Sequence, residues 1–242
     1  MKKIFSHPKS LRRTSMHYCS GCGHGIVHRL IAEIVDELGI RDRVIGIPPV
    51  GCAVIAYDYW DFDCCEAAHG RALAVATGIK KILPGNIVFT YQGDGDLAAI
   101  GTCETIHTAN RGENLTTIFI NNAVYGMTGG QMAPTTLLGQ KTTTSPWGRD
   151  LKTSGYSLKI SELLAQLPAV KYIERVSLYS PQQVIQAKKA IKQGFLNQID
   201  NLGFSLVEVL SPCPTYWRMS PKQAMDWIRD VMSKEFPLGK IK

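Results

Sequence analysis

Two strand-like runs, NIVFTYQGDGD (residues 86–96) and LTTIFINN (residues 115–122), enclose a segment of helical character. Both runs are rich in β-branched and aromatic residues, and the segment from Leu97 to Asn110 is predicted to be a helix. A strand, a helix and a second strand in this order form a parallel unit. The carboxyl ends of its two strands meet at one crevice, where open α/β sheets bind ligands.

Each run ends in polar residues that suit a phosphate and a metal ion. Gly93 and Gly95 allow backbone amides to approach a phosphate closely. Asp94 and the side-chain oxygen of Asn122 are ligands of the kind that Mg²⁺ prefers. A Gly-Asp-Gly is also a common turn, and the asparagine pair at the end of the next strand is what favours a ligand site. These residue types alone predict a metal-bound phosphate at the strand ends.

The rest of the chain continues the alternation of strands and helices. Further strands are predicted at 43–47, 171–178 and 204–210, and further helices at 25–38, 67–83, 181–198 and 221–236. The polar segment 137–157 is predicted to be a long loop, which in a compact domain is usually functional or mobile. This order predicts an α/β fold with a mainly parallel, doubly wound sheet flanked by helices.

The composition is that of a compact soluble protein, with 242 residues, 45% of them hydrophobic and 19% charged. Residues 1–18 lack the apolar stretch of a signal peptide, and no run approaches the ~18 apolar residues of a membrane span. A cytoplasmic protein without membrane contact is therefore predicted. The net charge of +7 is spread along the chain, which argues against nucleic-acid binding.

Four of the seven cysteines stand in distinctive settings: Cys19 and Cys22 in a C-x-x-C, Cys52 after Gly51, and Cys213 between two prolines. Without a signal peptide, a disulfide framework is not expected, and metal or redox chemistry is favoured. From the residues alone, a zinc site, an iron–sulfur cluster and plain buried thiols stay open as alternatives.

The spacing of Gly-Asp-Gly and Asn-Asn resembles the thiamine-diphosphate motif. In enzymes with that motif, an aspartate, the second asparagine and a nearby backbone carbonyl hold Mg²⁺ against the diphosphate. The resemblance implies that Asp94, Asn122 and the carbonyl of Val124 do so here.

The wider pattern resembles the β subunit of the 2-oxoacid:ferredoxin oxidoreductases, and within them the group for branched-chain 2-oxoacids such as 2-oxoisovalerate. The similarity covers about residues 16–240 and includes the C-x-x-C with the following Gly-His, the Gly-Cys at 51–52, His-Gly-Arg-Ala at 69–72 and the segment 125–131. It implies a single thiamine-diphosphate-binding domain over residues 1–242, with an N-terminal C-x-x-C segment and a C-terminal Cys213 segment. It also implies that Cys19, Cys22, Cys52 and Cys213 hold a [4Fe–4S] cluster. The remaining Cys64, Cys65 and Cys103 would be ordinary small residues.

Further site residues follow from the same resemblance. Cofactor contacts are expected from Gly51, Cys52, His69, Gly93, Gly95, Asp96, Tyr125 and Met127. Thr128 and Gln131 are expected to supply polar contacts to the reacting groups from a loop that closes over the thiazolium or substrate. Arg71 is a candidate for binding the substrate carboxylate, and a structural ion pair is its alternative. For His24 the alternative is a hydrogen bond at the helix start, and His107 is expected to be a core or surface residue.

The resemblance implies oxidative decarboxylation of a 2-oxoacid to an acyl-coenzyme A, with electrons passing through the cluster to ferredoxin. Formation of the thiamine carbanion requires a glutamate at the aminopyrimidine, and this glutamate would come from an α subunit that carries the pyrimidine domain. Further expected partners are γ and ferredoxin-like δ subunits or domains. The basic net charge would help to steer an acidic ferredoxin. The alternatives are 2-oxoglutarate or pyruvate as substrate, a non-redox thiamine enzyme with zinc or structural cysteines, and a scaffold without catalysis.

Overall fold

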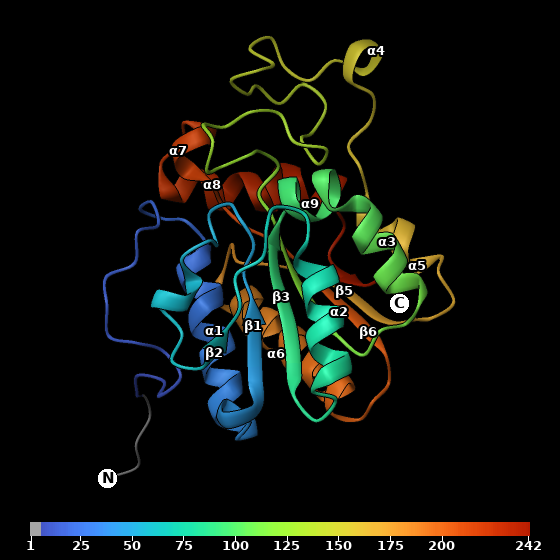
Figure 1. Ribbon diagram of the computed structural model, residues 1–242. Coiled ribbons are helices and arrows are strands. Elements are labelled where there is room, and N and C mark those ends of the chain that lie inside the picture. Colours follow the sequence, from blue (N-terminus) through green and yellow to red (C-terminus); the bar gives the residue numbers. More distant parts are fainter. Residues whose placement is uncertain (1–5) are drawn as a thin grey trace.

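The computed structural model describes residues 6–242 as a seven-stranded sheet with helices on both faces (Figure 1). The strand order is β2-β1-β3-β4-β6-β5-β7. In chain order the strands are β1 (Val44–Ile47), β2 (Asp63–Cys64), β3 (Ile87–Gly93), β4 (Thr116–Asn121), β5 (Val170–Ser177), β6 (Phe204–Leu210) and β7 (Gly239–Lys240). Neighbouring strands are parallel except β5 and β7. The predicted mainly parallel, doubly wound α/β fold is confirmed.

Helices pack on the sheet in two layers. On one face lie α1 (His24–Leu38) and α6 (Pro181–Ile199), and on the other lie α2 (Ala72–Ile82), α3 (Thr102–Asn110) and α5 (Ile160–Ala165). Because both faces are covered, β4 and β6 are buried along their whole length, so that even the polar Glu208 of β6 is only 1% exposed. The shorter elements are α4 (Leu151–Ser154), α7 (Pro214–Trp217), α8 (Pro221–Trp227), α9 (Ser233–Glu235), the 3₁₀ turns η1 (Arg41–Arg43) and η2 (Ala56–Asp58), and the π-helical η3 (Asp96–Ile100) and η4 (Ile228–Met232).

Two predicted helices differ from the observed ones because two backbone segments approach closely. The helix predicted from residue 67 begins only at Ala72, and the next predicted helix is divided at Gly101. A side chain at Gly70, where φ is +76°, would meet the backbone of Ile100 at 2.8 Å. A side chain at Gly101 would in turn meet the Gly70 carbonyl at 2.8 Å. The first part of the divided helix is the π-helical η3, a form that is frequent at functional sites.

The predicted long loop is a loop in the structure apart from the four residues of α4. Arg149, which is 7% exposed, organises it. Its guanidinium lies at 2.7–3.2 Å from the backbone carbonyls of Ala133, Pro134, Thr136, Ser154, Gly155 and Tyr156. Since a guanidinium presents its donors in a fixed planar array, these contacts define the path of the loop. Just before this loop, Thr135 bonds to Asp94 and Thr136 bonds to the Ala123 carbonyl, which places this part of the chain at the carboxyl ends of β3 and β4.

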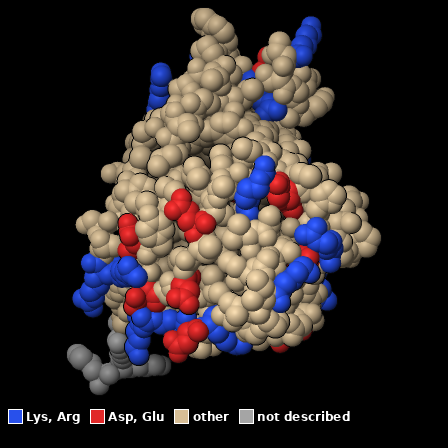
Figure 2. Space-filling view, viewed as in Figure 1, with Lys and Arg blue, Asp and Glu red and all other residues tan. Residues whose placement is uncertain are grey.

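Charged side chains are mixed over the visible surface. Figure 2 shows acidic and basic groups side by side over the lower part of this face. Among the ion pairs, Lys188 on α6 lies 2.8 Å from Glu33 and 2.7 Å from Glu37 on α1. Over residues 6–242, no helix is both long and apolar enough to cross a lipid bilayer.

Candidate functional site

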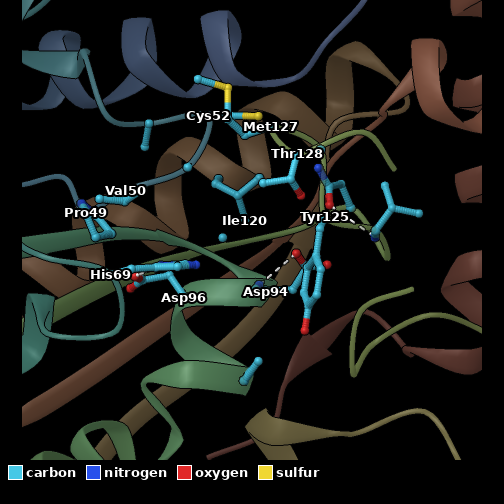
Figure 3. A pocket seen from close by; sticks show the side chains of 18 of the residues that line it. Pro49, Val50, Cys52, His69, Asp94, Asp96, Ile120, Tyr125, Met127 and Thr128 are labelled. Atoms are coloured by element: carbon cyan, nitrogen blue, oxygen red, sulfur yellow. Dashed lines mark hydrogen bonds and ion pairs between the residues drawn. The ribbon is translucent and has the colours of Figure 1, made fainter. Parts of the chain in front are cut away.

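A cavity of about 270 Å³ lies at the carboxyl ends of the central strands (Figure 3). Every residue predicted to contact a cofactor lines it, namely Gly51, Cys52, His69, Gly93, Asp94, Gly95, Asp96, Asn122, Val124, Tyr125 and Met127. The other lining residues are His24, Pro49, Val50, Ala53, Ala99, Ile100, Ile120, Gly126 and Thr128. The topology of parallel strands thus brings together motifs that are far apart in the sequence.

Asp94 is the first residue after β3 and is 3% exposed. Its Oδ2 accepts a hydrogen bond from Thr135 Oγ1 at 2.8 Å, and its Oδ1 accepts one from Gly95 N at 3.1 Å. Burial raises its pKa to about 7, while hydrogen bonds from Thr135 and from the backbone of Gly95 and Val124 lower it. A buried carboxylate of this kind is stabilised by a bound cation, so the residue fits a metal ligand.

The two asparagines at the end of β4 face different partners. The Asn121 side chain donates to Glu208 Oε1 at 2.7 Å inside the core, whereas Asn122 lines the cavity. This division follows from the alternation of side chains along a strand. The indole of Trp217 donates to the Asn122 carbonyl at 3.0 Å, and Ala123 has a φ of +56° that turns the chain toward Val124. Asn122 and Val124 are thereby held next to Asp94, with oxygen atoms that suit Mg²⁺.

Of the four cysteines predicted to hold a cluster, Cys213 is buried, Cys22 and Cys52 are half-buried, and Cys19 is exposed. Burial raises the pKa of Cys22 to about 11 and the pKa values of Cys52 and Cys213 to about 12. The negative charge of Cys22 further raises the pKa of Cys52 and of Cys213, and that of Cys19 acts on Cys22 and Cys52. Such a setting disfavours free thiolates, and a bound metal would stabilise a thiolate ligand there.

Cys52, Cys213 and Asn122 approach one another around Gly126. A methyl group at this position would lie 3.2 Å from Cys52 Sγ, 3.4 Å from Asn122 Nδ2 and 3.9 Å from Cys213 Sγ. In the part of the chain that the structure describes, no three Cys, His, Asp or Glu side chains converge on one point as ligands of a single ion do. An iron–sulfur cube takes one cysteine for each iron, so its ligands surround a common space instead.

His69 has a carboxylate partner at the cavity wall. Its Nδ1 lies 2.7 Å from Asp96 Oδ1, and Asp96 also accepts from Gly70 N at 2.5 Å and from Gln92 Nε2 at 2.6 Å. Asp96 therefore uses both oxygens within the protein, although it lines the cavity as predicted.

Arg71 lies outside the residues that line the cavity. Its guanidinium is paired with Glu104 on α3, as the structural alternative predicts. Gln131 also lies outside and bonds to Thr128, accepting from Thr128 Oγ1 at 2.6 Å and donating to its carbonyl at 2.8 Å. Thr128 lines the cavity. Of the three residues predicted to contact reacting groups, the structure thus places only Thr128 at the cavity.

His24 joins the cavity to a buried aromatic cluster. Its Nδ1 is 2.7 Å from the Tyr91 hydroxyl, and its ring stacks on Tyr18 at 4.8 Å. Burial, with a smaller effect of His17, lowers the pKa of His24 to about 3, so its imidazole is neutral. His24 is therefore a cavity residue as well as the first residue of α1.

Sequence reasoning missed several residues that support this site. Thr135, Gln92, Tyr91 and Trp217 bond to Asp94, Asp96, His24 and Asn122. Gln92 and Tyr91 have the appearance of ordinary strand residues in the sequence. Thr135 belongs to a segment without any motif, and nothing in the local sequence marks Trp217 as a partner of Asn122.

Comparison with known proteins bears on this geometry. The family described as thiamine pyrophosphate enzyme, C-terminal TPP binding domain, matches residues 50–209. The 2-oxoglutarate synthase subunit KorB of Methanocaldococcus jannaschii is 38% identical over 93% of this chain and 80% of its own length. The chain belongs to the 2-oxoacid oxidoreductase branch of the thiamine pyrophosphate enzymes. The resemblance stated from the motifs is confirmed.

Other members of the family are also similar. The ketoisovalerate oxidoreductase subunit VorA of Methanothermobacter thermautotrophicus is 52% identical over 98% of this chain and 52% of its own length. The chain thus spans about half the length of that curated relative. The solved 2-oxoglutarate:ferredoxin oxidoreductase from Magnetococcus marinus, with 2-oxoglutarate, coenzyme A and succinyl-CoA bound, superposes with a TM-score of 0.79 at 25% identity, covering 95% of this chain and 74% of that one.

Proposed function

We propose that this chain is the cofactor-binding β component of a 2-oxoacid:ferredoxin oxidoreductase that converts a branched-chain 2-oxoacid, such as 2-oxoisovalerate, to its acyl-coenzyme A. The substrate class is supported by the higher identity to the ketoisovalerate oxidoreductase subunit, 52%, than to the 2-oxoglutarate synthase subunit, 38%. The coenzyme A bound in the solved relative supports a thiol as the acyl acceptor.

The observation that carries the proposal is the environment of Gly126. The Asn122 amide and the sulfurs of Cys52 and Cys213 all lie within 4 Å of the position that a methyl group would take there. A metal-bound diphosphate and a cysteine-ligated cluster would then occupy adjoining spaces. Electron transfer between two groups requires such proximity.

The residues at the strand ends fit a diphosphate with its metal ion. Asp94, Asn122 and the carbonyl of Val124 would hold Mg²⁺, and Gly93 and Gly95 would let the backbone approach the phosphates. When bound, thiamine diphosphate supplies an electron sink for decarboxylation. The protein contributes two things with its own side chains. The buried Ile120, Val124 and Ala53 line the cavity and exclude water from it, and Thr135 holds the Asp94 carboxylate through a hydrogen bond.

Cys19, Cys22, Cys52 and Cys213 would hold a [4Fe–4S] cluster. When bound, the cluster supplies a one-electron acceptor beside the cavity, from which ferredoxin takes electrons. Because Cys19 is exposed, the ligand set reaches the molecular surface, where an electron carrier can dock.

The partners are proposed to be an α subunit with the pyrimidine domain and its glutamate, γ and ferredoxin-like δ components, and ferredoxin itself. Asp96 is the only acidic side chain besides Asp94 that lines the cavity among the described residues, and both of its oxygens are engaged. Activation of the cofactor by a further carboxylate therefore calls for another polypeptide or domain. In this proposal residues 1–242 form one cofactor-binding domain.

The test is to isolate the complex through an affinity tag on this chain and to assay it without oxygen. Iron and acid-labile sulfide are expected at about four each per chain. 2-Oxoisovalerate is expected to reduce a viologen dye faster than 2-oxoglutarate or pyruvate, and only with coenzyme A. Zinc in place of iron, with decarboxylation but no dye reduction, would establish the non-redox thiamine enzyme instead.

A pair of cysteine variants separates the ligand set from the other thiols. Cys213→Ser is expected to retain thiamine-diphosphate binding and to lose electron transfer to ferredoxin. Cys103→Ser is the matched control, because Cys103 is exposed on α3 and lies outside the cavity lining. Full electron transfer in Cys213→Ser would show that the fourth ligand is assigned wrongly.

A further inference from the structure

The hydrogen-bonded group around Asp96 has a different chemistry from the metal and cysteine sites. Asp96 is 2% exposed, and its oxygens receive Gly70 N and Gln92 Nε2 while Oδ1 also contacts His69 Nδ1. Gln92 is 1% exposed, and its Oε1 has no hydrogen-bond partner within residues 6–242. Its one side-chain hydrogen bond is the one to Asp96. The Asp96 carboxylate is therefore held by two donors, Gly70 N and Gln92 Nε2, and faces the imidazole of His69.

These contacts decide which ring nitrogen of His69 carries the proton. An ionised carboxylate only accepts hydrogen bonds, so the proton between His69 and Asp96 belongs to Nδ1 of the ring. In a neutral imidazole, Nε2 is then an acceptor with a free lone pair. Figure 3 shows the His69 ring beside Asp96 and extending into the cavity. A carboxylate that orients an imidazole toward a ligand is the arrangement of a general base.

We propose that His69 accepts the proton that the reaction releases, with Asp96 and Gln92 as positioning residues. This role rests on the proposed function. A 2-oxoacid anion and a thiol give a thioester, carbon dioxide, two electrons and one proton. The carbon–carbon bond to the carboxylate and the S–H bond break, a carbon–sulfur bond forms, and the electrons pass to ferredoxin. The proton forms an N–H bond at Nε2 of His69.

The surroundings of His69 suit both halves of this proton transfer. The Asp96 carboxylate at 2.7 Å balances the positive charge that the ring acquires. The His69 side chain is 41% exposed, so the imidazolium can return its proton to water for the next turnover. Gln92 holds the second carboxylate oxygen and so keeps Asp96 from turning away.

The test compares His69→Ala with His107→Ala in the tagged complex, since His107 is an exposed histidine on α3 outside the cavity. Removing a general base lowers kcat by ~10²-fold or more, whereas the Kd for thiamine diphosphate with Mg²⁺, followed by protein fluorescence, should change less than ~3-fold. Free imidazole added to the assay should restore part of the turnover of His69→Ala. Asp96→Asn should lower kcat without a matching rise in KM, and imidazole should not rescue it.

The outcomes separate this role from its alternatives. A kcat for His69→Ala within ~3-fold of wild type would overturn the role. Loss of cofactor affinity, with no rescue by imidazole, would also overturn it and make His69 a cofactor-binding residue. If the wild-type complex oxidises no 2-oxoacid, the proposed function itself fails, and this role fails with it. Normal turnover in His107→Ala together with rescue of His69→Ala would support the proposal.

Discussion

Gly126→Ala tests whether Cys52, Cys213 and Asn122, the asparagine proposed to bind Mg²⁺, share one space. The position does not have a positive φ, so alanine is compatible with the backbone. The added methyl would lie 3.2 Å from Cys52 Sγ, 3.4 Å from Asn122 Nδ2 and 3.9 Å from Cys213 Sγ. Non-bonded heavy atoms are most stable at about 3.5–4.0 Å, so only the contact with Cys52 requires a clear shift of a few tenths of an ångström.

The size of the effect follows from these distances. Overpacking a buried site costs about 1–3 kcal/mol, and one tight contact places this variant near the lower end. For a protein of this length, a loss of ~1 kcal/mol lowers the Tm by about 2–4 °C. The displacement of Cys52 has a larger consequence for bound groups, because ligand geometry tolerates little movement. Iron per chain is expected to fall well below the wild-type value, and the affinity for thiamine diphosphate with Mg²⁺ is expected to fall as well.

Gly78→Ala is the matched control for this variant. Gly78 lies in α2, and within residues 6–242 no atom other than its chain neighbours and the nearby helix backbone is within 4 Å of the position that its methyl group would take. Alanine in a helix interior is more favourable than glycine by about 0.5–1 kcal/mol, so the Tm should rise slightly and iron content should stay unchanged. Thermal unfolding and colorimetric iron and sulfide assays measure both variants. Wild-type iron content and cofactor affinity in Gly126→Ala would refute the shared space.

Three further variants test other parts of the structure. Burial lowers the pKa of His28 well below its usual value, so its protonation opposes folding, and the free energy of unfolding should fall as the pH drops below ~6.5. His28→Leu should reduce this dependence of the unfolding free energy on pH, measured by denaturant titrations at several pH values. Trp217→Phe removes the hydrogen bond to the Asn122 carbonyl and should lower the free energy of unfolding by ~1 kcal/mol. Mg²⁺-dependent cofactor binding, measured by calorimetry, should also weaken, and an unchanged affinity would show that Trp217 does not position Asn122 for binding. Arg71→Gln breaks a half-exposed ion pair with Glu104, worth about 0–1 kcal/mol, and should leave KM for the 2-oxoacid nearly unchanged; a large rise in KM would restore Arg71 as a substrate-binding residue.

The fold was predictable because its central strands are buried on both faces. Runs rich in β-branched and aromatic residues, such as residues 115–120, then stand out from Asn121 and Asn122, which follow them. The order of strands and helices supplies the parallel topology, and that topology brings Asp94 next to Asn122. The break at Gly101 was not predictable, because it depends on the approach of Gly70 from another part of the chain.

The side chains that support the site residues could not be predicted from the sequence, because their contacts depend on the folded chain. Thr135 reaches Asp94 from a segment without regular structure, 41 residues further along the chain. Gln92 is separated from Asp96 by only four residues, but a glutamine in a strand carries no sign that it faces a carboxylate. Local sequence shows which residues are chemically able to act. It does not show which remote side chain orients them, and for that reason Arg71 was a candidate until its partner Glu104 was located.

The positions of the four proposed cluster cysteines along the chain limit when such a site can be completed during synthesis. Cys19 and Cys22 precede the whole sheet, whereas Cys213 and Trp217 follow its β6 strand. A ribosome has therefore released almost the entire domain before the last sulfur and the indole that holds Asn122 can reach their places. In the proposed assignment, insertion of iron and sulfide would act on a nearly finished polypeptide, and a nascent chain cut short before residue 213 would lack one of the four proposed ligands.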